Sequence, residues 1–375
     1  TFKYTTSCIY MLCIRCAIQK QFKTQSHEFQ YLAIGPGRKF ISFCHLIYHR
    51  DITPQINDGL RKAVEQIKYV DPDVVALQEA QSTSDVINRL VKMLGSEWSG
   101  VQHCAPEKTD HDGQVIVTKH KIIGYDHTKA GMNLRIRLNG SGREISVWSM
   151  HLEYKNFAPD KILEKESIEK ILNAELEQNK LHGRLYNIIE LIKHPKFVEQ
   201  IMNTNNVPVI VAGDFNTPSD LDYIEATKNT HLGYVVEFPV TKLLRTVAGM
   251  TDSYREVHPN PVTHPGATWP VYETDRDTDD LTPRIKDRID YIFFRGPLST
   301  IKSEPFSGIT PIVDDRGESW RNNEYPSDHF SLISEFEVYD GPIYPVPPSF
   351  EIPREYAAFD HSYETLEECS LNIVQ

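Results

Sequence analysis

An apolar run that ends in the tetrapeptide Gly-Asp-Phe-Asn constrains the fold of this chain more than any other feature. Residues 207–212 read Val-Pro-Val-Ile-Val-Ala, which is typical of a buried strand, and Asp214 and Asn216 follow directly. Because side chains alternate along an extended segment, residues two apart point to the same face. The sequence therefore predicts that a carboxylate and a carboxamide enter one cleft. The alternative is a turn-and-cap role for both residues.

Other polar residues also stand at the ends of apolar runs. An ionised carboxylate at the end of a buried strand costs several kcal/mol if it is dry and unpaired, so such positions need a partner or a ligand. Adjacent acid and imidazole groups can supply an acid, a base or a metal ligand. The residues are Glu79 after the run 74–77, His151 after 145–150, Asp290 before 291–294, and the pair Asp328 and His329 before 331–336.

Taken in order, these five segments resemble the endonuclease/exonuclease/phosphatase superfamily, whose members are DNase I-like metal-dependent phosphoesterases. The resemblance covers roughly residues 38 to 340. It implies an α/β fold, a four-layer sandwich of two mixed β-sheets flanked by helices. It also implies a phosphoester hydrolase, of the phosphodiesterase or nuclease class, in which an activated water attacks directly and a divalent metal assists.

The resemblance assigns a catalytic role to each strand-end residue. His329 takes the proton from water, and Asp290 holds the imidazole ring. Asp214 and Asn216 orient the nucleophile, the leaving group or a phosphoryl oxygen. His151 matches a histidine that contacts the scissile phosphate, although a histidine in this pattern is also compatible with a core position.

The metal and substrate positions follow from the same resemblance. Glu79 is the expected ligand of Mg²⁺ or Mn²⁺, and Asp328 completes the metal shell or orients a water. The competing interpretation is that Glu79 pairs with a basic side chain. Trp269, in Thr268-Trp269-Pro270, matches a substrate-binding position and either stacks on the substrate or packs within the protein. One departure is Cys44, where the family pattern carries an Asn, and a thiol is a poor ligand for a hard cation.

The extent of the resemblance and the composition divide the chain into three parts. Residues 1–37 form an N-terminal extension, 38–340 the catalytic domain, and 341–375 a Pro-rich and acidic C-terminal tail. Apolar spacing predicts an amphipathic helix over 57–70, with Leu60, Val64 and Ile67 on one stripe, and a second helix over 85–94. The segment 160–203 is expected to form two helices, broken at His194-Pro195.

Composition limits the partners. The net charge of −12 argues against strong non-specific binding to DNA, which depends on Lys and Arg neutralising phosphates. No transmembrane segment is expected, because the apolar run over 8–18 is short and interrupted by Arg15. The phosphoester substrate stays open among nucleic acid, phospholipid (as in sphingomyelinases) and sugar phosphate (as in small-molecule phosphatases). A catalytically weakened binding or scaffold protein of the same fold is the alternative.

Overall fold

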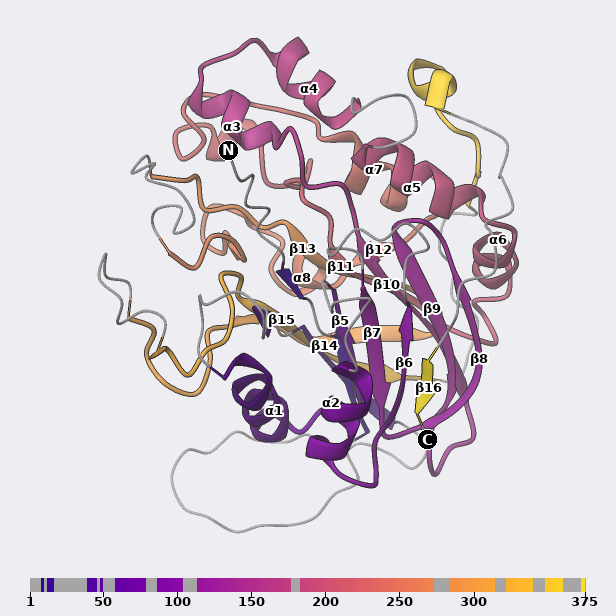
Figure 1. Ribbon diagram of the computed structural model, residues 1–375. Coiled ribbons are helices and arrows are strands. Elements are labelled where there is room, and N and C mark those ends of the chain that lie inside the picture. The colour runs from indigo at the N-terminus through magenta and orange to yellow at the C-terminus, as the bar shows by residue number, and fades with distance from the viewer. Residues whose placement is uncertain are drawn as a thin grey trace.

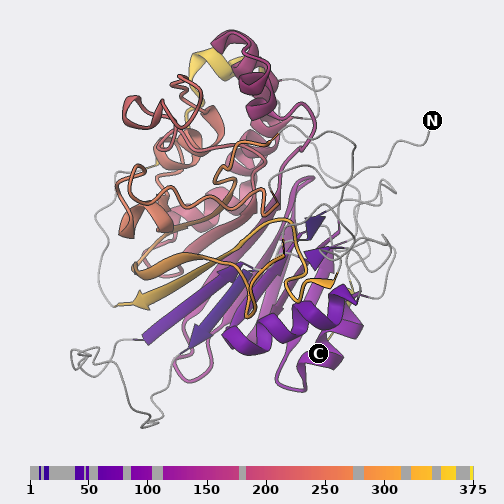
Figure 2. The ribbon, with the colours of Figure 1, turned by 90° about the vertical axis from the view of Figure 1, so that its left-hand side faces the viewer.

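Two β-sheets pack face to face, and helices cover the outer face of each (Figures 1 and 2). The computed structural model describes residues 8–9, 12–16, 39–45, 48–49, 58–78, 86–103, 113–176, 183–272, 283–313, 322–339, 348–359 and 372–374, with strand pairing alone before residue 58. Within these residues, both sheets combine parallel and antiparallel pairs. The expected four-layer α/β sandwich is confirmed.

The two edge strands of the first sheet are β14 and β16, and β16 is the last strand of the described chain. Its order is β14-β15-β3-β5-β7-β6-β16, with β2 paired to β3 as well. The bounds are β2 (Leu12–Cys16), β3 (Lys39–His45), β5 (Val74–Leu77), β6 (Ser99–His103), β7 (Gln114–Thr118), β14 (Leu298–Phe306), β15 (Ser331–Val338) and β16 (Asn372–Val374).

The second sheet carries most of the strand-end residues that the sequence singled out. Its order is β12-β13-β11-β10-β9-β8, so β11 lies in the interior with β10 and β13 beside it. A separate pair joins β1 (Cys8–Ile9) to β4 (Tyr48–His49). The bounds are β8 (Lys121–His127), β9 (Gly131–Arg137), β10 (Glu144–His151), β11 (Val209–Asp214), β12 (Thr251–Asp252) and β13 (Asp290–Arg295).

Alternation along the strands of the second sheet builds two cores. On β11, Ile210 and Ala212 face the first sheet and pack with residues such as Val74, whereas Val209 and Val211 face the helices. The same alternation on β13 sends alternate aromatic residues to opposite cores. Both faces of these strands are thus buried, which explains why the run 207–212 is continuously apolar.

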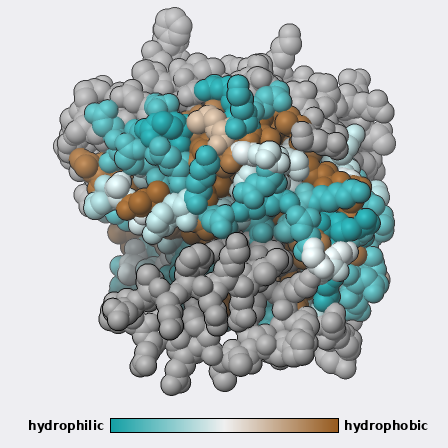
Figure 3. Space-filling view, turned by 90° about the horizontal axis from the view of Figure 1, so that it is seen from below, coloured by the Kyte–Doolittle hydropathy of each residue, from teal (hydrophilic) through white to brown (hydrophobic). Residues whose placement is uncertain are grey.

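Helices close the outer faces. On the first sheet, α1 (Gly59–Val70) and α2 (Val86–Leu94) lie where the sequence predicted them, and the stripe Leu60, Val64 and Ile67 is buried. The face on which these helices lie carries largely hydrophilic side chains with hydrophobic ones between them (Figure 3). The second sheet is covered by α5 (Arg184–Lys193), α6 (Pro195–Met202) and α7 (Pro239–Thr246).

The segment 160–203 is more divided than expected. The break at His194-Pro195 is confirmed, because α5 ends at Lys193 and α6 begins at Pro195. Two further helices precede it, α3 (Ala158–Leu163) and α4 (Ile168–Leu176), separated where Lys165 takes a positive φ of 58°. A left-handed residue cannot continue a helix, and the periodicity of a Glu- and Lys-rich stretch does not reveal it.

Shorter elements complete the described chain. They are η1 (Glu225–Thr227), α8 (Ser253–Val257) and η3 (Arg354–Phe359). Part of the Pro-rich region packs on the helical side of the second sheet through Phe350, Ile352 and Tyr356, and β16 pairs with β6. None of the helices among the described residues has both the length and the apolar character needed to cross a bilayer.

Gly213 marks a close approach between two central strands. It pairs with Met150 of β10, has a φ of +146°, and a Cβ atom there would lie 1.8 Å from the Met150 carbonyl oxygen. Glycine is required by both the backbone conformation and the space. The neighbouring register pair is His151 with Asp214, so this contact sets the spacing of two candidate site residues.

We expect Gly213→Ala to lower the free energy of unfolding by about 3 kcal/mol or more, because strain and a backbone clash combine there. Gly142→Ala is the matched control, since Gly142 also has a positive φ (+68°) but open space around it, and strain alone costs about 1–2 kcal/mol. Urea denaturation of both variants measures the difference. Equal losses would contradict the crowding at Gly213.

Candidate functional site

Three candidate residues form one row across the second sheet. His151 ends β10 and is the register partner of Asp214 on β11, and Asp214 is in turn the register partner of Asp290 on β13. Side chains in register on adjacent strands lie close together. His151 and Asp290 are 139 positions apart in the sequence. The register of the strands brings both residues to the same end of one sheet.

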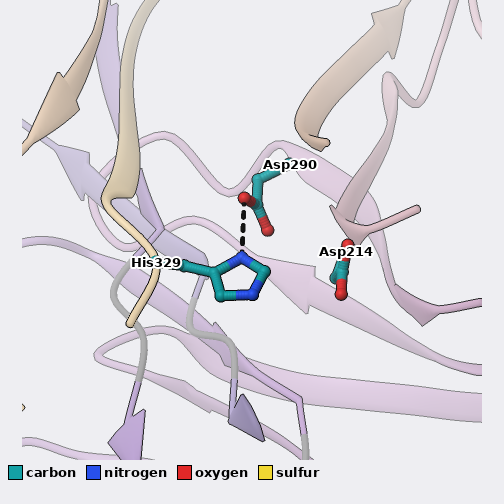
Figure 4. A group of neighbouring side chains, drawn as sticks. All are labelled: Asp214, Asp290 and His329. Atoms are coloured by element: carbon teal, nitrogen blue, oxygen red, sulfur yellow. Dashed lines mark hydrogen bonds and ion pairs between the residues drawn. The ribbon is translucent and has the colours of Figure 1, made fainter. Parts of the chain in front are cut away.

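His329 completes the cluster from the opposite sheet. It stands just before β15, and its Nδ1 lies 3.0 Å from Asp290 Oδ2 (Figure 4). Ligand atoms of Asp214, Asp290 and His329 lie within 4.8 Å of one another, and all three residues are buried. In Figure 4 the second ring nitrogen of His329 lies on the Asp214 side. The site is therefore built where the ends of the two sheets meet.

The charge state of His329 is set by two opposing effects. Burial lowers the pKa of the imidazole, and the carboxylate of Asp290, followed by Asp328 and Asp214, raises it, so that the pKa is about 8. The hydrogen bond with Asp290 also raises it. The ring therefore gains or loses its proton near neutral pH, as an acid–base group must.

The backbone around His329 is held from several sides. Its N–H donates to Ser327 Oγ at 3.0 Å, and its carbonyl accepts from the Tyr325 hydroxyl at 2.9 Å. The Tyr325 hydroxyl also accepts from the Ser331 N–H at 2.7 Å. Two of these three bonds involve the hydroxyl of Tyr325, which is fully buried. The backbone is thus held in place, and the bond of Nδ1 with Asp290 orients the ring, before any ligand arrives.

Asp214 and Asn216 are arranged differently from the alternation that the sequence suggested. The strand ends at Asp214, and Asn216 takes a positive φ of 49°. Asp214 Oδ1 accepts from the Asn216 N–H at 2.7 Å, and Asn216 Nδ2 donates to the Leu152 carbonyl at 3.0 Å. This is the turn that the alternative interpretation described. It ties the loop after β11 to the loop after β10.

His151 faces the second oxygen of Asp214. The distance from His151 Nε2 to Asp214 Oδ2 is 3.7 Å, which is longer than a hydrogen bond. The sequence left open whether His151 is a core residue or a site residue. Its side chain is mostly buried and yet lies beside the carboxylate of the cluster.

Trp269 and Asp328 extend the site toward solvent. Trp269 is half-buried, its Nε1–H donates to Asp328 Oδ2 at 3.2 Å, and its ring centroid lies 5.9 Å from that of His329. Thr268 before it accepts from the N–H groups of Ile289 and Asp290 at 3.1 and 3.2 Å. The segment 268–269 thus joins the start of β13, which carries Asp290, to the segment before β15 that carries Asp328 and His329.

Glu79 and the side chain of Cys44 lie outside the described residues. The residue before Glu79 is informative, because the buried Gln78 donates from Nε2 to Ser149 Oγ on β10. The end of β5 therefore lies beside the end of β10, at the same end of the sandwich as the cluster. Cys44 lies on β3 in register with Ile333 and Val75.

Sequence reasoning missed the buried ion pairs behind the site. Arg288 stands two residues before Asp290 in the sequence. It donates from Nε to Asp222 Oδ2 at 3.0 Å and from Nη1 to Asp252 Oδ2 at 2.6 Å. Arg184 is buried against the loop that follows His151. Arg288 lies 36 and 66 residues from its partners, and the loop carbonyls that Arg184 binds lie 28 to 31 residues before it, so no local motif could have identified these contacts.

Two known proteins are similar to this chain in sequence. An uncharacterized protein of Caenorhabditis elegans is 32% identical over 289 residues, which are 75% of this chain and 86% of that protein. Nocturnin of Drosophila melanogaster is 26% identical over 307 residues, and the match spans 73% of this chain and 41% of Nocturnin.

Solved structures give weaker matches. The human Nocturnin catalytic domain with bound sulfate anion has a TM-score of 0.45 at 19% identity, covering 75% of this chain and 87% of that chain. D. rerio TDP2 complexed with single strand DNA product has a TM-score of 0.45 at 16% identity, covering 76% and 94%.

The family profile is decisive for membership. It spans residues 56–329, which include the row His151, Asp214 and Asp290 and end at His329. The segments that the sequence singled out from Glu79 onward fall within this span. The chain therefore belongs to the Endonuclease/Exonuclease/phosphatase family.

Proposed function

We propose that this chain is a divalent-metal-dependent phosphoester hydrolase in which an activated water attacks the phosphorus directly. The observation that carries the proposal is the buried cluster of Asp214, Asp290 and His329, with the imidazole 3.0 Å from a carboxylate. An imidazole oriented by a carboxylate is the arrangement that general-base catalysis requires. Family membership supports the same class of reaction.

His329 and Asp290 form the base unit. Asp290 accepts the hydrogen bond from Nδ1–H, so that the remaining nitrogen, Nε2, can take the proton from water. The carboxylate then stabilises the imidazolium that forms. The raised pKa of about 8 is the electrostatic counterpart of this stabilisation.

Asp214 and His151 lie beside the base unit. Asp214 has one oxygen in the turn with Asn216, and the other lies 3.7 Å from His151 Nε2. In the proposed reaction Asp214 orients the attacking water or the leaving oxygen, and His151 donates to a phosphoryl oxygen. Asn216 acts on this geometry by holding Asp214 and Leu152 together.

The donor set fits a hard cation. Carboxylate oxygens are the ligands that Mg²⁺ and Mn²⁺ prefer, and the carboxylates of Asp214, Asp290 and Asp328 make the surroundings of His329 acidic. Glu79 and Asp328 are the residues that would hold the ion, which when bound supplies positive charge to the phosphoryl oxygens. The chain carries a net charge of −12, so an anionic substrate needs such local compensation.

The second candidate function is a binding protein of the same fold with weakened catalysis. The observation behind it is Cys44 at the position where the family pattern has an amide. The two candidates differ in turnover, since a binding protein would retain ligand affinity without metal-dependent hydrolysis of a generic phosphodiester such as bis(4-nitrophenyl) phosphate.

Metal removal should abolish turnover of that phosphodiester, because the carboxylates of the site repel an anionic substrate until they are neutralised. The measurement is the hydrolysis rate after extensive chelation and after return of Mg²⁺ or Mn²⁺, with thermal unfolding as the control for fold. Unchanged rates in stripped, folded protein would exclude the metal-dependent mechanism.

His329→Ala and Asp214→Ala should each lower kcat by at least about 10²-fold, the scale of a positioned acid–base group. His264→Ala is the matched control, because His264 is an exposed histidine on another loop and should leave the rate unchanged. Circular dichroism checks that all three variants fold. Parent-like activity of His329→Ala would remove the assignment of the base.

The pKa of His329 in metal-free protein should be near 8, and Asp290→Asn should lower it below the ordinary 6.5, since burial then acts with less opposition. Because the folded pKa is raised, this group stabilises the fold fully below pH 6.5 and loses that contribution as pH rises through 8. NMR titration of the ring measures both proteins. His120, whose pKa burial lowers to about 4, is the internal control.

A further inference from the structure

Arg184, at the start of α5, is buried with every donor of its guanidinium in use. The residue is 1% exposed, and a guanidinium has five N–H donors. Three of its five acceptors are carbonyls of one loop, 153–156. The acceptors are Glu175 Oε1 at 3.1 Å and the carbonyl oxygens of Glu153 (3.0 Å), Lys155 (3.0 Å), Asn156 (2.8 Å) and Ala174 (2.6 Å).

The loop that Arg184 holds is the direct continuation of the strand that carries His151. Its first residues are tied to the site, since the Leu152 N–H donates to the Asp214 carbonyl at 2.9 Å. The Glu153 N–H donates to Asn187 Oδ1 at 3.0 Å, one helical turn after Arg184. Loop 153–156 is therefore clamped between the catalytic strand and α5.

The loop is followed by an aromatic side chain that packs beside the candidate site. Phe157, the residue after it, meets Trp269 edge to face, with ring centroids 5.3 Å apart and an interplanar angle of 84°. Both side chains are half-buried, and Trp269 also contacts Asp328 and His329. We call Phe157 and Trp269 the aromatic rim. Through these contacts of Trp269, the aromatic rim lies beside the cluster that is proposed to activate the attacking water.

Burying the Arg184–Glu175 ion pair costs desolvation free energy, which an apolar contact at this place would not cost. Glu175 is 0% exposed, and burial raises the pKa of its carboxyl while Arg184 and Thr217 act in the opposite direction. Buried ion pairs commonly add little net stability compared with apolar side chains of the same volume. What an arginine adds here is geometry, because its planar fork fixes three loop carbonyls at once.

We propose that Phe157 and Trp269 together contact a planar ring of the substrate, and that Arg184 is the positioning residue that holds Phe157 in place. The class of substrate is then a phosphoester that carries an aromatic ring next to the reacting phosphate, such as a nucleotide. The inference rests on the proposed function for the location of the phosphate. Stacking on an aromatic side chain tolerates any flat ring.

Calorimetric titration tests this without turnover. Adenosine 5′-monophosphate and ribose 5-phosphate share the sugar phosphate and differ in the ring, so the ratio of their Kd values in Mg²⁺ isolates the ring contact. The wild-type protein should prefer the first by about 10-fold or more, the scale of one base–aromatic stack. Phe157→Leu, which keeps an apolar side chain, should reduce that ratio several-fold and leave the Kd of ribose 5-phosphate unchanged.

Arg184→Lys keeps the charge opposite Glu175 but cannot serve five acceptors. It should reduce the same ratio, and the Arg184→Lys/Phe157→Leu double variant should be no worse than Phe157→Leu alone, because both act through one side chain. Asn187→Ala, which removes one contact to the loop, gives a milder second test if Arg184→Lys does not fold. Thermal unfolding of each variant separates a loss of stability from a change in the ratio.

The outcomes are distinct. Equal affinity of the wild-type protein for both ligands, or an unchanged ratio in Phe157→Leu, overturns the ring contact even if the protein hydrolyses phosphoesters. A reduced ratio in Phe157→Leu with an unchanged ratio in both folded Arg184→Lys and Asn187→Ala overturns the positioning role. A ring preference that depends on Phe157 and Arg184 in a protein without hydrolytic activity supports the rim and counts against the proposed function alone.

Discussion

The pairing of β11 between β10 and β13 is the constraint on which the site depends. The register of the three strands places His151, Asp214 and Asp290 in one row. The absence of a side chain at Gly213 allows β10 to approach β11 closely. Hydrogen bonds of the ladder cannot shift by one residue without moving every buried side chain to the wrong face. The geometry of the candidate site is therefore protected by the same register that buries Ile210 and Ala212.

Charge is buried around this row in pairs. Asp290 faces His329, Arg288 faces Asp222 and Asp252, and Arg184 faces Glu175. An unpaired charge at this depth would be strongly destabilising, so the two members of each pair must stay together. Each pair therefore holds in place the backbone segments that carry it. Arg288 fixes the approach to Asp290, and Arg184 fixes the loop after His151. The polar interior thus supports the site on two sides.

Much of the site could be predicted from single residues at strand ends. Asp290 and His329 were expected to pair, and they do so at 3.0 Å, because a polar residue next to an apolar run lies at the end of a strand, where the ends of the two sheets meet. Asn216 shows the limit of this rule. The strand stops at Asp214, and the positive φ of Asn216 directs its amide to Leu152. Alternation applies only while the chain stays extended.

The sequence by itself determined the amphipathic helix predicted over 57–70 and the strand-end acids and imidazoles, because these follow from local periodicity and from the cost of burying polar groups. The sandwich followed from the resemblance of its motifs to the family. Only the tertiary structure decided that Phe157 meets Trp269, that Arg184 holds the loop 153–156, and that α3 and α4 are separate helices. Those contacts join side chains and backbone carbonyls from segments that have no shared pattern. Carbonyl groups are identical at every residue, so no sequence motif records which of them an arginine will bind.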